Sequence, residues 1–403
     1  MNQSRDNKPH IGIFGRRNTG KSSFINALVG QEIAIVSEQA GTTTDPVKKS
    51  IEIFGIGPAI VVDTAGIDDE GILGNKRIEK SLEVLKMVDV AVLMISENTF
   101  GAFEADLVNA FGNYDIPFIV VHNKFDIVPL QGKIKSVIEN ISDTIVLDFS
   151  SQTGYNFDPV IKALRNKIPE SVFQKPPLLG DVIGKGDYVL LITPIDNEAP
   201  DGRMILPQVM AIRDVLDNDA INIVLKEDQV ENFFKTSGIT PKLAITDSQV
   251  FGKMKDIVPA HVPFTSFSIM LARFRGDFKA YLDGTPKIDE LQDGDRVLIL
   301  ESCTHQVNCD DIGRFKLPNW IKKYTGKNIE FDIVAGLDKI SRNMADYKLV
   351  IQCGGCMVTR KQLRSRLKPA KDAQIAISNY GMAIAWVNGM FDRVTEPFRK
   401  VYA

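Results

Sequence analysis

The segment Gly15–Ser22 restricts the possible folds of this chain more than any other stretch. It reads Gly-Arg-Arg-Asn-Thr-Gly-Lys-Ser, which fits a glycine-rich phosphate-binding loop ending in Lys and Ser. An apolar run, Ile11–Phe14, precedes it, and a helix-like segment, Lys21–Leu28, follows. A chance glycine-rich turn would not need this strand–loop–helix context. In such a loop, successive backbone N–H groups and a helix N-terminus face a bound phosphate.

Residues 10–150 alternate short apolar runs with longer amphipathic stretches. The runs are rich in Val and Ile, as in strands buried on both faces of a parallel sheet. The expected strands are Ile11–Phe14, Ile60–Val62, Val90–Ile95, Phe118–Val121 and Ile145–Phe149, and the expected helices are Lys21–Leu28, Arg77–Met87 and Phe103–Asn113. This alternation predicts an α/β fold with a doubly wound, mostly parallel sheet in a nucleotide-binding domain over residues 1–170.

Several side chains near the loop suit phosphoryl chemistry. Lys21 can bridge the β- and γ-phosphates, and Ser22 can bind Mg²⁺. Asp63, at the end of an apolar strand, can hold Mg²⁺ through water, and the Gly66 amide can sense the γ-phosphate. We therefore expect nucleoside triphosphate hydrolysis with Mg²⁺.

The segment Asn123–Asp126 follows another apolar run and indicates which base is bound. A carboxylate at Asp126 can accept both N1–H and the exocyclic amine of guanine, a pair of donors that adenine lacks. The predicted GTP-binding residues are Asn18, Thr19, Gly20, Lys21, Ser22, Ser23, Asn123, Lys124, Asp126, Ser150 and Ser151.

The remainder of the chain divides into two further α/β units. The Pro- and Gly-rich stretch 168–180 is typical of a linker. A small unit over 178–260 contains expected strands Tyr188–Thr193, Ile221–Leu225 and Leu243–Thr246 and expected helices Met204–Leu216 and Gln229–Lys235. A third unit over 264–403 contains expected helices Ser266–Leu282, Pro318–Tyr324, Gly336–Met344 and Lys361–Leu367 and expected strands Arg296–Glu301, Ile329–Val334, Tyr347–Gln352 and Gln374–Ser378.

Composition argues against nucleic-acid and membrane partners. The 403 residues carry 48 basic and 51 acidic side chains, a net charge of −3. The first nine residues lack the apolar core of a signal peptide. No apolar run approaches the ~18 residues that a membrane span needs. We expect a cytoplasmic location.

All four cysteines lie in the last quarter of the chain. Cys303 and His305 follow one expected strand, and Cys353 and Cys356 follow another. Ligands bind at the carboxyl edge of a parallel sheet, so the two sets can meet there. Three thiolates with one imidazole suit either zinc or an iron–sulfur cluster, and spacing alone does not decide between them. Cys309 is a further ligand or a buried bystander.

The first domain resembles the TrmE–Era group of GTPases on Gly15–Ser22, Gly41–Asp45, Asp63–Gly66 and Asn123–Asp126. The resemblance implies that Thr43 is the switch threonine that binds Mg²⁺ when GTP is present. Ile67 stands where Ras-like proteins have a water-orienting glutamine. Asn18 matches an asparagine that binds an activating K⁺ in potassium-dependent members. Arg16 and Arg17 are expected to be solvated.

The whole chain resembles the HydF family of [FeFe]-hydrogenase maturation GTPases, whose pattern is Cys-x-His followed by His-Cys-x-x-Cys. Cys303, His305, Cys353 and Cys356 match it, but Gln352 stands in place of the second histidine. The resemblance implies a [4Fe–4S] cluster on the three cysteines. The fourth ligand is open among His305, a carboxylate such as Glu301 or Asp310, water, or none.

The resemblance also implies a scaffold that carries a diiron precursor to apo-[FeFe]-hydrogenase. The implied partners are the radical-SAM maturases HydE and HydG, and a second copy of the chain that pairs through the middle domain. The strand Tyr188–Thr193 is the expected pairing edge. The alternative is a ribosome- or tRNA-associated GTPase of the TrmE–Era type with a zinc-stabilised C-terminal interaction domain.

Overall fold

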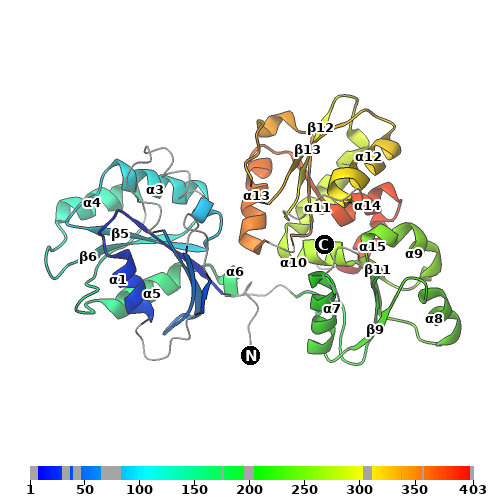
Figure 1. Cartoon of the computed structure of the whole chain (residues 1–403), viewed down its shortest axis with the longest axis horizontal. Coiled ribbons are helices and arrows are strands. Elements are labelled where there is room, and N and C mark those ends of the chain that lie inside the picture. Colours follow the sequence, from blue (N-terminus) through cyan, green and yellow to red (C-terminus); the bar gives the residue numbers. More distant parts are fainter. Residues whose placement is uncertain are drawn as a thin grey trace. The chain divides into compact units, whose positions relative to one another are not determined.

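A computed structural model describes residues 8–29, 37–39, 47–64, 83–142, 144–173, 177–194, 204–302, 311–336, 338–355 and 358–399. The chain divides into two compact units, Met1–Lys175 and Pro176–Ala403 (Figure 1).

The first unit contains one seven-stranded sheet among its described residues, in the order β2-β3-β4-β1-β5-β6-β7. Strands β4, β1, β5, β6 and β7 are parallel, whereas β2 and β3 are antiparallel to their neighbours. The strands are β1 His10–Gly15, β2 Ser37–Gln39, β3 Val47–Ile53, β4 Gly57–Asp63, β5 Val90–Ser96, β6 Phe118–Asn123 and β7 Val146–Asp148. The helices are α1 Lys21–Val29, α3 Ala102–Asn113, α4 Gly132–Ile141, α5 Phe157–Lys167 and α6 Glu170–Phe173. The predicted mostly parallel α/β sheet is confirmed.

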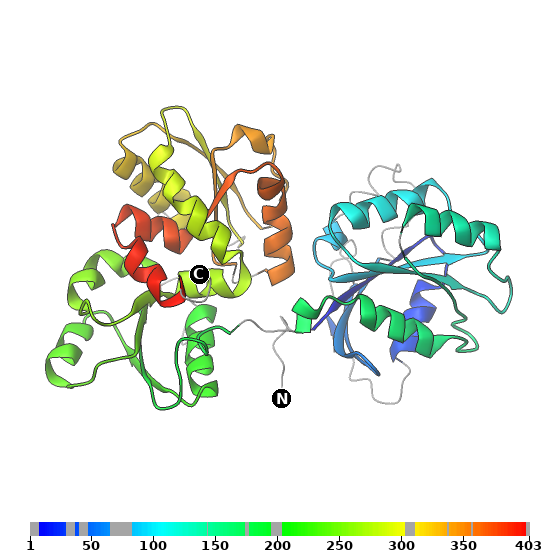
Figure 2. The ribbon, with the colours of Figure 1, turned by 180° about the vertical axis from the view of Figure 1, so that it is seen from behind.

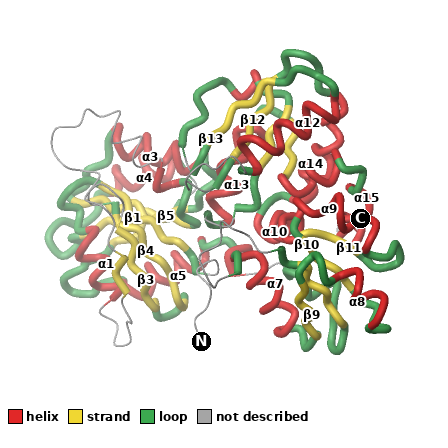
Figure 3. The backbone as a smooth tube through the Cα atoms, turned by 45° about the vertical axis from the view of Figure 1, so that its right-hand side comes forward, coloured by secondary structure: helices red, strands yellow, loops and turns green. Residues whose placement is uncertain are grey.

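Both faces of this sheet are covered by helices, which explains why its strands are apolar without interruption. Along β5, Val90, Val92 and Met94 belong to the core beneath α1 and α5. The alternate residues Ala91, Leu93 and Ile95 belong to the core beneath α3 and α4. Figure 3 shows these helix pairs on opposite faces of the yellow strands.

The chain changes direction in the sheet at β1. It reaches β3 and β4 on one side of β1 and then crosses to β5 on the other side. In open α/β sheets, the crevice at the carboxyl end of such a strand is where ligands bind. The loop that begins at Gly15 therefore occupies the position that this fold offers for a ligand.

In the first unit, one strand was not predicted, and one predicted helix lies mostly outside the described residues. Strand β3, antiparallel to β4, was not predicted, because three consecutive polar residues, Lys48–Ser50, interrupt the apolar residues of Val47–Ile53. Most of the expected helix Arg77–Met87 lies outside the described residues, which resume at residue 83.

The second unit contains two four-stranded parallel sheets among its described residues, in the orders β11-β10-β8-β9 and β13-β12-β14-β15. This confirms the two expected α/β folds. The strands are β8 Tyr188–Ile192, β9 Ile221–Leu225, β10 Leu243–Thr246, β11 Phe264–Ser266, β12 Arg296–Leu300, β13 Glu330–Val334, β14 Leu349–Gln352 and β15 Ala376–Asn379. The helices are α7 Leu206–Asp217, α8 Val230–Thr236, α9 Phe251–Ile257, α10 Phe267–Arg275, α11 Phe278–Gly284, α12 Leu317–Thr325, α13 Arg360–Asp372, α14 Tyr380–Val387 and α15 Phe391–Arg399.

The two sheets of the second unit share one apolar core. The last helix, α15, returns to the first of these sheets and packs on β11. Its Arg393 donates to the Val258 and Pro259 carbonyls at 2.8 and 2.9 Å, and its guanidinium lies 5.2 Å from the Phe264 ring centroid. In Figure 2 the red C-terminal segment lies against the green part of the unit. The two α/β folds are thus tied together by the end of the chain.

Three expectations for the second unit are wrong. The stretch Ser266–Leu282 is not one helix, because α10 ends at Gly276 in an extended conformation and the Asp277 carboxylate accepts from Ala280 N–H to begin α11. The described part of Gly336–Met344 is a loop that ends in a 3₁₀ turn, where the Asn343 side chain accepts from Ala345 N–H. Asp and Asn side chains such as those of Asp277 and Asn343 hydrogen-bond to nearby backbone N–H groups and so compete with helix formation.

The third error concerns the expected pairing edge. Strand β8, Tyr188–Ile192, lies between β10 and β9 and is therefore an interior strand. The free edges of this sheet are β9 and β11 among the described strands.

No helix in the described part of the chain is long and apolar enough to span a lipid bilayer.

We expect Gly284→Ala to destabilise the second unit. A Cβ at this position would overlap the backbone of Ile377 in β15, with the amide nitrogen at 2.6 Å. The backbone of β15 is hydrogen-bonded to β14 and packed against α11, so it cannot move aside cheaply, and we expect a loss of about 2 kcal/mol in the free energy of unfolding. Gly252→Ala in α9 is the control, because its Cβ would meet only Asn388 Oδ1 at 3.8 Å. Thermal or urea unfolding measures both, and equal stability of the two variants would contradict the packing described.

Candidate functional site

Two glycines give the loop after β1 its shape. Gly15 has φ 142° and Gly20 has φ 90°, both in the region that favours glycine. A Cβ on Gly15 would collide with the Met94 carbonyl oxygen of β5, and a Cβ on Gly20 would collide with the Asn123 carboxamide. Both glycines of the motif are thus required by close approach of neighbouring strand ends.

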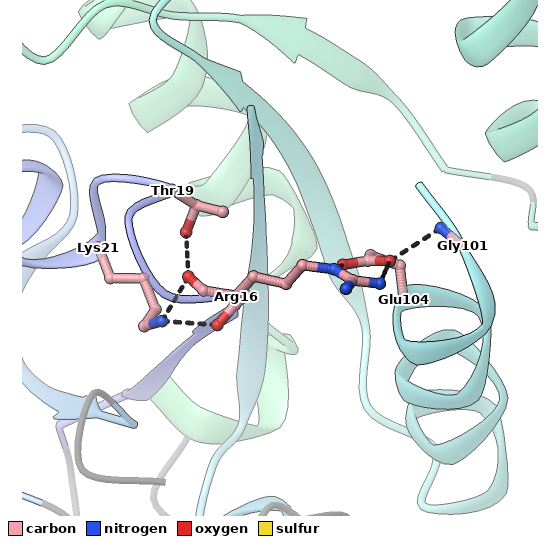
Figure 4. Close-up of polar contacts among 6 residues, drawn as sticks. Arg16, Thr19, Lys21, Gly101 and Glu104 are labelled. Carbon is pink, nitrogen blue, oxygen red and sulfur yellow. Dashed lines mark hydrogen bonds and ion pairs between the residues drawn. The ribbon is translucent and has the colours of Figure 1, made fainter. Parts of the chain in front are cut away.

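Lys21 closes this loop from the first turn of α1. Its ammonium donates to the carbonyls of Gly15 at 2.6 Å and Arg16 at 2.8 Å, and only 6% of the residue is exposed (Figure 4). Asn18, at the tip, has φ 65°. Ser22 and Ser23 follow Lys21 in the helix and are exposed. The cation is therefore held inside the ring of backbone groups that would surround a phosphate.

The Asn123 carboxamide joins three of the predicted motifs. Its Nδ2 donates to the Thr19 carbonyl at 2.9 Å, and its Oδ1 accepts from Ser151 N–H and Ser151 Oγ, both at 3.0 Å. Ser150 is fully buried, and its Oγ accepts from Thr153 N–H at 3.2 Å. The phosphate loop, the end of β6 and the loop after β7 therefore form one hydrogen-bonded assembly.

The segment expected to read the base has an exposed carboxylate. Asp126 is exposed, while Lys124 has φ 63° and its Nζ lies 3.0 Å from Glu97 Oε1. Phe125 stacks on Tyr155, with ring centroids 4.8 Å apart and planes 10° apart. The sequence analysis did not identify Tyr155, because its partner is set by the fold rather than by a motif.

The end of β4 lies beside the phosphate loop. Asp63 pairs in register with Ile13 of β1, and Thr64 Oγ1 donates to the Ile13 carbonyl at 2.5 Å. Asp63 thus stands at the sheet edge where the phosphate loop begins. The switch residues Thr43 and Gly66, together with Ile67, lie outside the described residues.

Arg16 is exposed, as expected, but its guanidinium is also paired. It is not simply solvated, because its Nε and Nη2 donate to Glu104 Oε1 and Oε2 at 2.7 and 3.0 Å. Glu104, in the first turn of α3, is 1% exposed, and its Oε2 also accepts from Gly101 N–H at 2.8 Å (Figure 4). A buried carboxylate needs such partners. A single acidic residue early in a helix gave no sequence signal for this pair.

A buried histidine in β6 contacts a carboxylate of β7. His122 Nδ1 is 3.2 Å from Asp148 Oδ1, and the ring is fully buried. Burial lowers the pKa of His122, and the nearby Asp148 carboxylate opposes that shift.

In the second unit, Cys353 lies at the carboxyl edge of the last sheet. Its backbone N–H donates to the Leu300 carbonyl at 3.0 Å, which brings the ends of β12 and β14 together. The Cys353 sulfur accepts from Ser302 N–H at 3.1 Å and contacts Ser302 Oγ at 2.8 Å. Ser302, the last described residue before Cys303 in the sequence, therefore lies beside Cys353 at this sheet edge.

Gln352 is fully buried beside this sulfur. Its Nε2 lies 3.3 Å from the Leu300 carbonyl and from Ser302 Oγ, and 3.7 Å from Cys353 Sγ. Its Oε1 has no hydrogen-bond partner among the described residues. Where the family pattern has a histidine, this chain therefore places N–H donors close to a cysteine sulfur.

Of the expected cysteine and histidine ligands, the structure describes Cys353, whose sulfur lies near N–H donors, an environment that also suits a sulfur ligand of an iron–sulfur cluster. The other expected ligands, Cys303, His305 and Cys356, lie outside the described residues, as does Cys309. Within the described part of the chain, no group of three His, Cys, Asp or Glu residues could hold a metal ion. Nearby Glu301 is engaged by Arg314, with Nε and Oε2 3.1 Å apart.

The chain matches three family models in succession. The model described as "50S ribosome-binding GTPase" covers residues 10–124, "Hydrogen maturase F dimerization domain" covers 178–276, and "Hydrogen maturase F tetramerization domain" covers 279–397. The first places the N-terminal unit among P-loop GTPases. The other two imply that the chain self-associates.

Two curated relatives each match less than half of the chain. The chain is 32% identical over 181 residues to GTPase Der of Wolinella succinogenes, covering 41% of this chain and 38% of Der. It is 37% identical over 182 residues to tRNA modification GTPase MnmE of Nitrosomonas eutropha, covering 44% of this chain and 37% of MnmE. The chain thus spans well under half the length of these relatives.

Among solved structures, the G domain of the T. maritima FeoB iron transporter has a TM-score of 0.32 and 17% identity, over 40% of this chain and 99% of that one. So distant a likeness does not bear on function. The order of the three family models, with both maturase domains after a P-loop GTPase domain, does. The chain belongs to the HydF family of hydrogenase maturation GTPases.

Proposed function

We propose that this chain is a GTP-hydrolysing scaffold that assembles the diiron precursor and delivers it to apo-[FeFe]-hydrogenase. One observation carries the proposal. A chain of the HydF family has a phosphate loop bonded to its guanine motif in one unit and a cysteine sulfur at the start of a second ligand segment in the other.

In the proposed nucleotide site, each residue of the first unit has a separate role. Lys21 neutralises charge on the β- and γ-phosphates, and Ser22 and Thr43 bind Mg²⁺, which Asp63 holds through water. The Gly66 amide senses the γ-phosphate. Asp126 selects guanine, and its exposed carboxylate is accessible to a base. Thr19, Gly20, Ser23, Lys124, Ser150 and Ser151 complete the contact set.

Asn18 is proposed to bind K⁺. Asn18 lies at the tip of the loop in a left-handed backbone conformation, which supports this proposal because the conformation departs from the regular backbone of a helix or strand. A K⁺ near the phosphates would supply the positive charge that other GTPases obtain from an arginine finger.

The last domain, proposed to span 264–403, would hold a [4Fe–4S] cluster on Cys303, Cys353 and Cys356, with His305 as the candidate fourth ligand. Such a cluster supplies an iron site at which a precursor can be held. The N–H groups of Ser302 and Gln352 lie near the Cys353 sulfur and would offset its negative charge.

We propose that GTP orders Thr43 and the segment after Gly66. This ordering changes the affinity of the chain for HydE, HydG and the hydrogenase in the cytoplasm.

The middle domain, proposed to span 178–260, is the candidate homodimer module. Strand β9 has one neighbour, β8, among the described strands, and exposes Ile221 and Val224 by 43% and 42%. An open edge with exposed apolar side chains suits pairing with the same edge of a second copy.

Lys21→Ala and Cys353→Ser give reciprocal expectations. The first removes a cation from the phosphate loop and should slow GTP hydrolysis by about a hundredfold, which a phosphate-release assay measures. The second removes one sulfur and should abolish the broad [4Fe–4S] absorbance after anaerobic reconstitution with iron and sulfide, while hydrolysis continues. Loss of hydrolysis in Cys353→Ser would refute the separation of the two sites. Retained zinc without the broad absorbance in the unsubstituted chain would favour the zinc-stabilised alternative.

Replacing K⁺ by Na⁺ should slow GTP hydrolysis by about tenfold or more, because the smaller ion fits a potassium site poorly and the stabilising charge is lost. Steady-state hydrolysis at constant ionic strength measures this. Asn18→Ala should hydrolyse equally slowly in both salts. Equal rates in the unsubstituted chain would remove Asn18 from any ion site.

Val224→Lys should halve the mass of the particle in solution, because a charge on an open strand edge blocks edge-to-edge pairing. Light scattering after size exclusion measures the mass. Asp256→Asn, which changes the charge by the same amount at an exposed position in α9, serves as the control and should leave the mass unchanged. An unchanged mass in Val224→Lys would place the dimer contact elsewhere.

A further inference from the structure

A segment outside every predicted motif contacts both ends of the nucleotide site. Residues Glu97–Glu104, here called the strap, connect β5 to the first turn of α3. The strap starts beside the base-reading segment, because Ser96 at the end of β5 pairs in register with Asn123 of β6. It ends at the phosphate loop, where Glu104 meets Arg16.

At the base end, two adjacent residues of the strap hold the segment that follows β6. Glu97 Oε1 lies 3.0 Å from Lys124 Nζ. The Asn98 carboxamide donates to the Pro129 carbonyl at 3.0 Å and accepts from Gln131 N–H at 2.7 Å. The contacted residues precede and follow Asp126 in the sequence, so the strap holds the chain on either side of the residue proposed to select guanine.

The backbone at this end is held in an unfavourable conformation. Glu97 and Asn98 have φ 54° and 55°, a left-handed pair in which neither residue is glycine. Such a conformation persists only where the surroundings determine it, and it is enriched at functional sites. The Lys124 ion pair and the two Asn98 hydrogen bonds are those surroundings.

At the phosphate end, the strap fixes the residue that supports Lys21. Glu104 receives two hydrogen bonds from the Arg16 guanidinium, and the Gly101 N–H of the strap donates to the same carboxylate. The Arg16 carbonyl in turn accepts from Lys21 Nζ and from Thr19 Oγ1, both at 2.8 Å (Figure 4). A chain of contacts therefore runs from Glu104 through Arg16 to the catalytic ammonium.

We propose that the strap is a positioning element that couples the protein's hold on the guanine base to its hold on the phosphates. Glu97 and Glu104 are positioning residues, since each acts through another side chain and not on the nucleotide. Because one short segment fixes both ends, loosening either end loosens the other. This inference rests on the GTP binding proposed above and adds residues that set how long the nucleotide stays bound.

Nucleotide release tests the strap in the full-length protein. A fluorescent GDP is loaded, and its dissociation is followed during a chase with unlabelled GDP. The variants are Glu97→Gln, Glu104→Gln and the double variant, with Glu139→Gln as control, since Glu139 forms an exposed pair with Lys135 in α4. Gln at 104 keeps an acceptor for Gly101 N–H and removes the charge. Glu97 is 62% exposed at its side chain, so that variant folds even if the buried one does not.

Each single variant should release GDP about three- to tenfold faster, as expected for one weakened charge-assisted contact. The double variant should release GDP no faster than the quicker single variant. Rates equal to the control would overturn the proposal, and so would multiplied effects in the double variant, since these mean two independent ends. If the unsubstituted chain fails to hold GDP, the proposed GTP binding falls instead.

Discussion

Parallel pairing of strands determines where the candidate site residues of the described segments lie. In a parallel sheet every strand ends at the same edge, so loops distant in sequence meet there. In the first unit this edge gathers Gly15, Asp63, Ser96 and Asn123. In the second unit it gathers Ser302 and Cys353, which the pairing of β12 with β14 brings into contact.

At each edge, buried carboxamides connect the strand ends. Asn123 bonds the phosphate loop to Ser151, and Gln352 lies within hydrogen-bond range of Leu300, Ser302 and Cys353. An amide carries donors and an acceptor without a charge, so it can be buried at a lower desolvation cost than a carboxylate or an ammonium. Both edges are therefore organised by neutral groups, while charges such as Lys21 and Glu104 are buried only with partners.

Much of this could be read from the sequence because it depends on local pattern. Apolar runs predicted β1, β5 and β6, and motif spacing predicted which loops would surround a nucleotide. Contacts that depend on tertiary packing could not be read in this way. The Arg16–Glu104 pair joins residues 88 positions apart, and no motif marks either as a partner of the other. The interior position of β8 agrees with its uninterrupted apolar run Val189–Ile192, whose residues are fully buried, so the expectation of a pairing edge there ran against its composition.

The two α/β folds of the second unit are packed together and are not independent domains that simply follow one another in the sequence. Its two sheets share a core, and α15 carries the end of the chain back to β11. Self-association through the first sheet and ligand binding at the edge of the second would therefore be mechanically linked. In the first unit, the strap plays the connecting role that α15 plays in the second, because it links the base and phosphate ends of the proposed nucleotide site.

The central claim is that the nucleotide state of the first unit sets the affinity of the scaffold for its partners. The most direct measurement is the dissociation constant of the full-length, cluster-reconstituted chain for apo-[FeFe]-hydrogenase, with GDP and with a non-hydrolysable GTP analogue. The account predicts a difference of about tenfold or more between the two states, equivalent to about 1.4 kcal/mol of coupling. Identical affinities for the hydrogenase and both maturases in the two nucleotide states would contradict it.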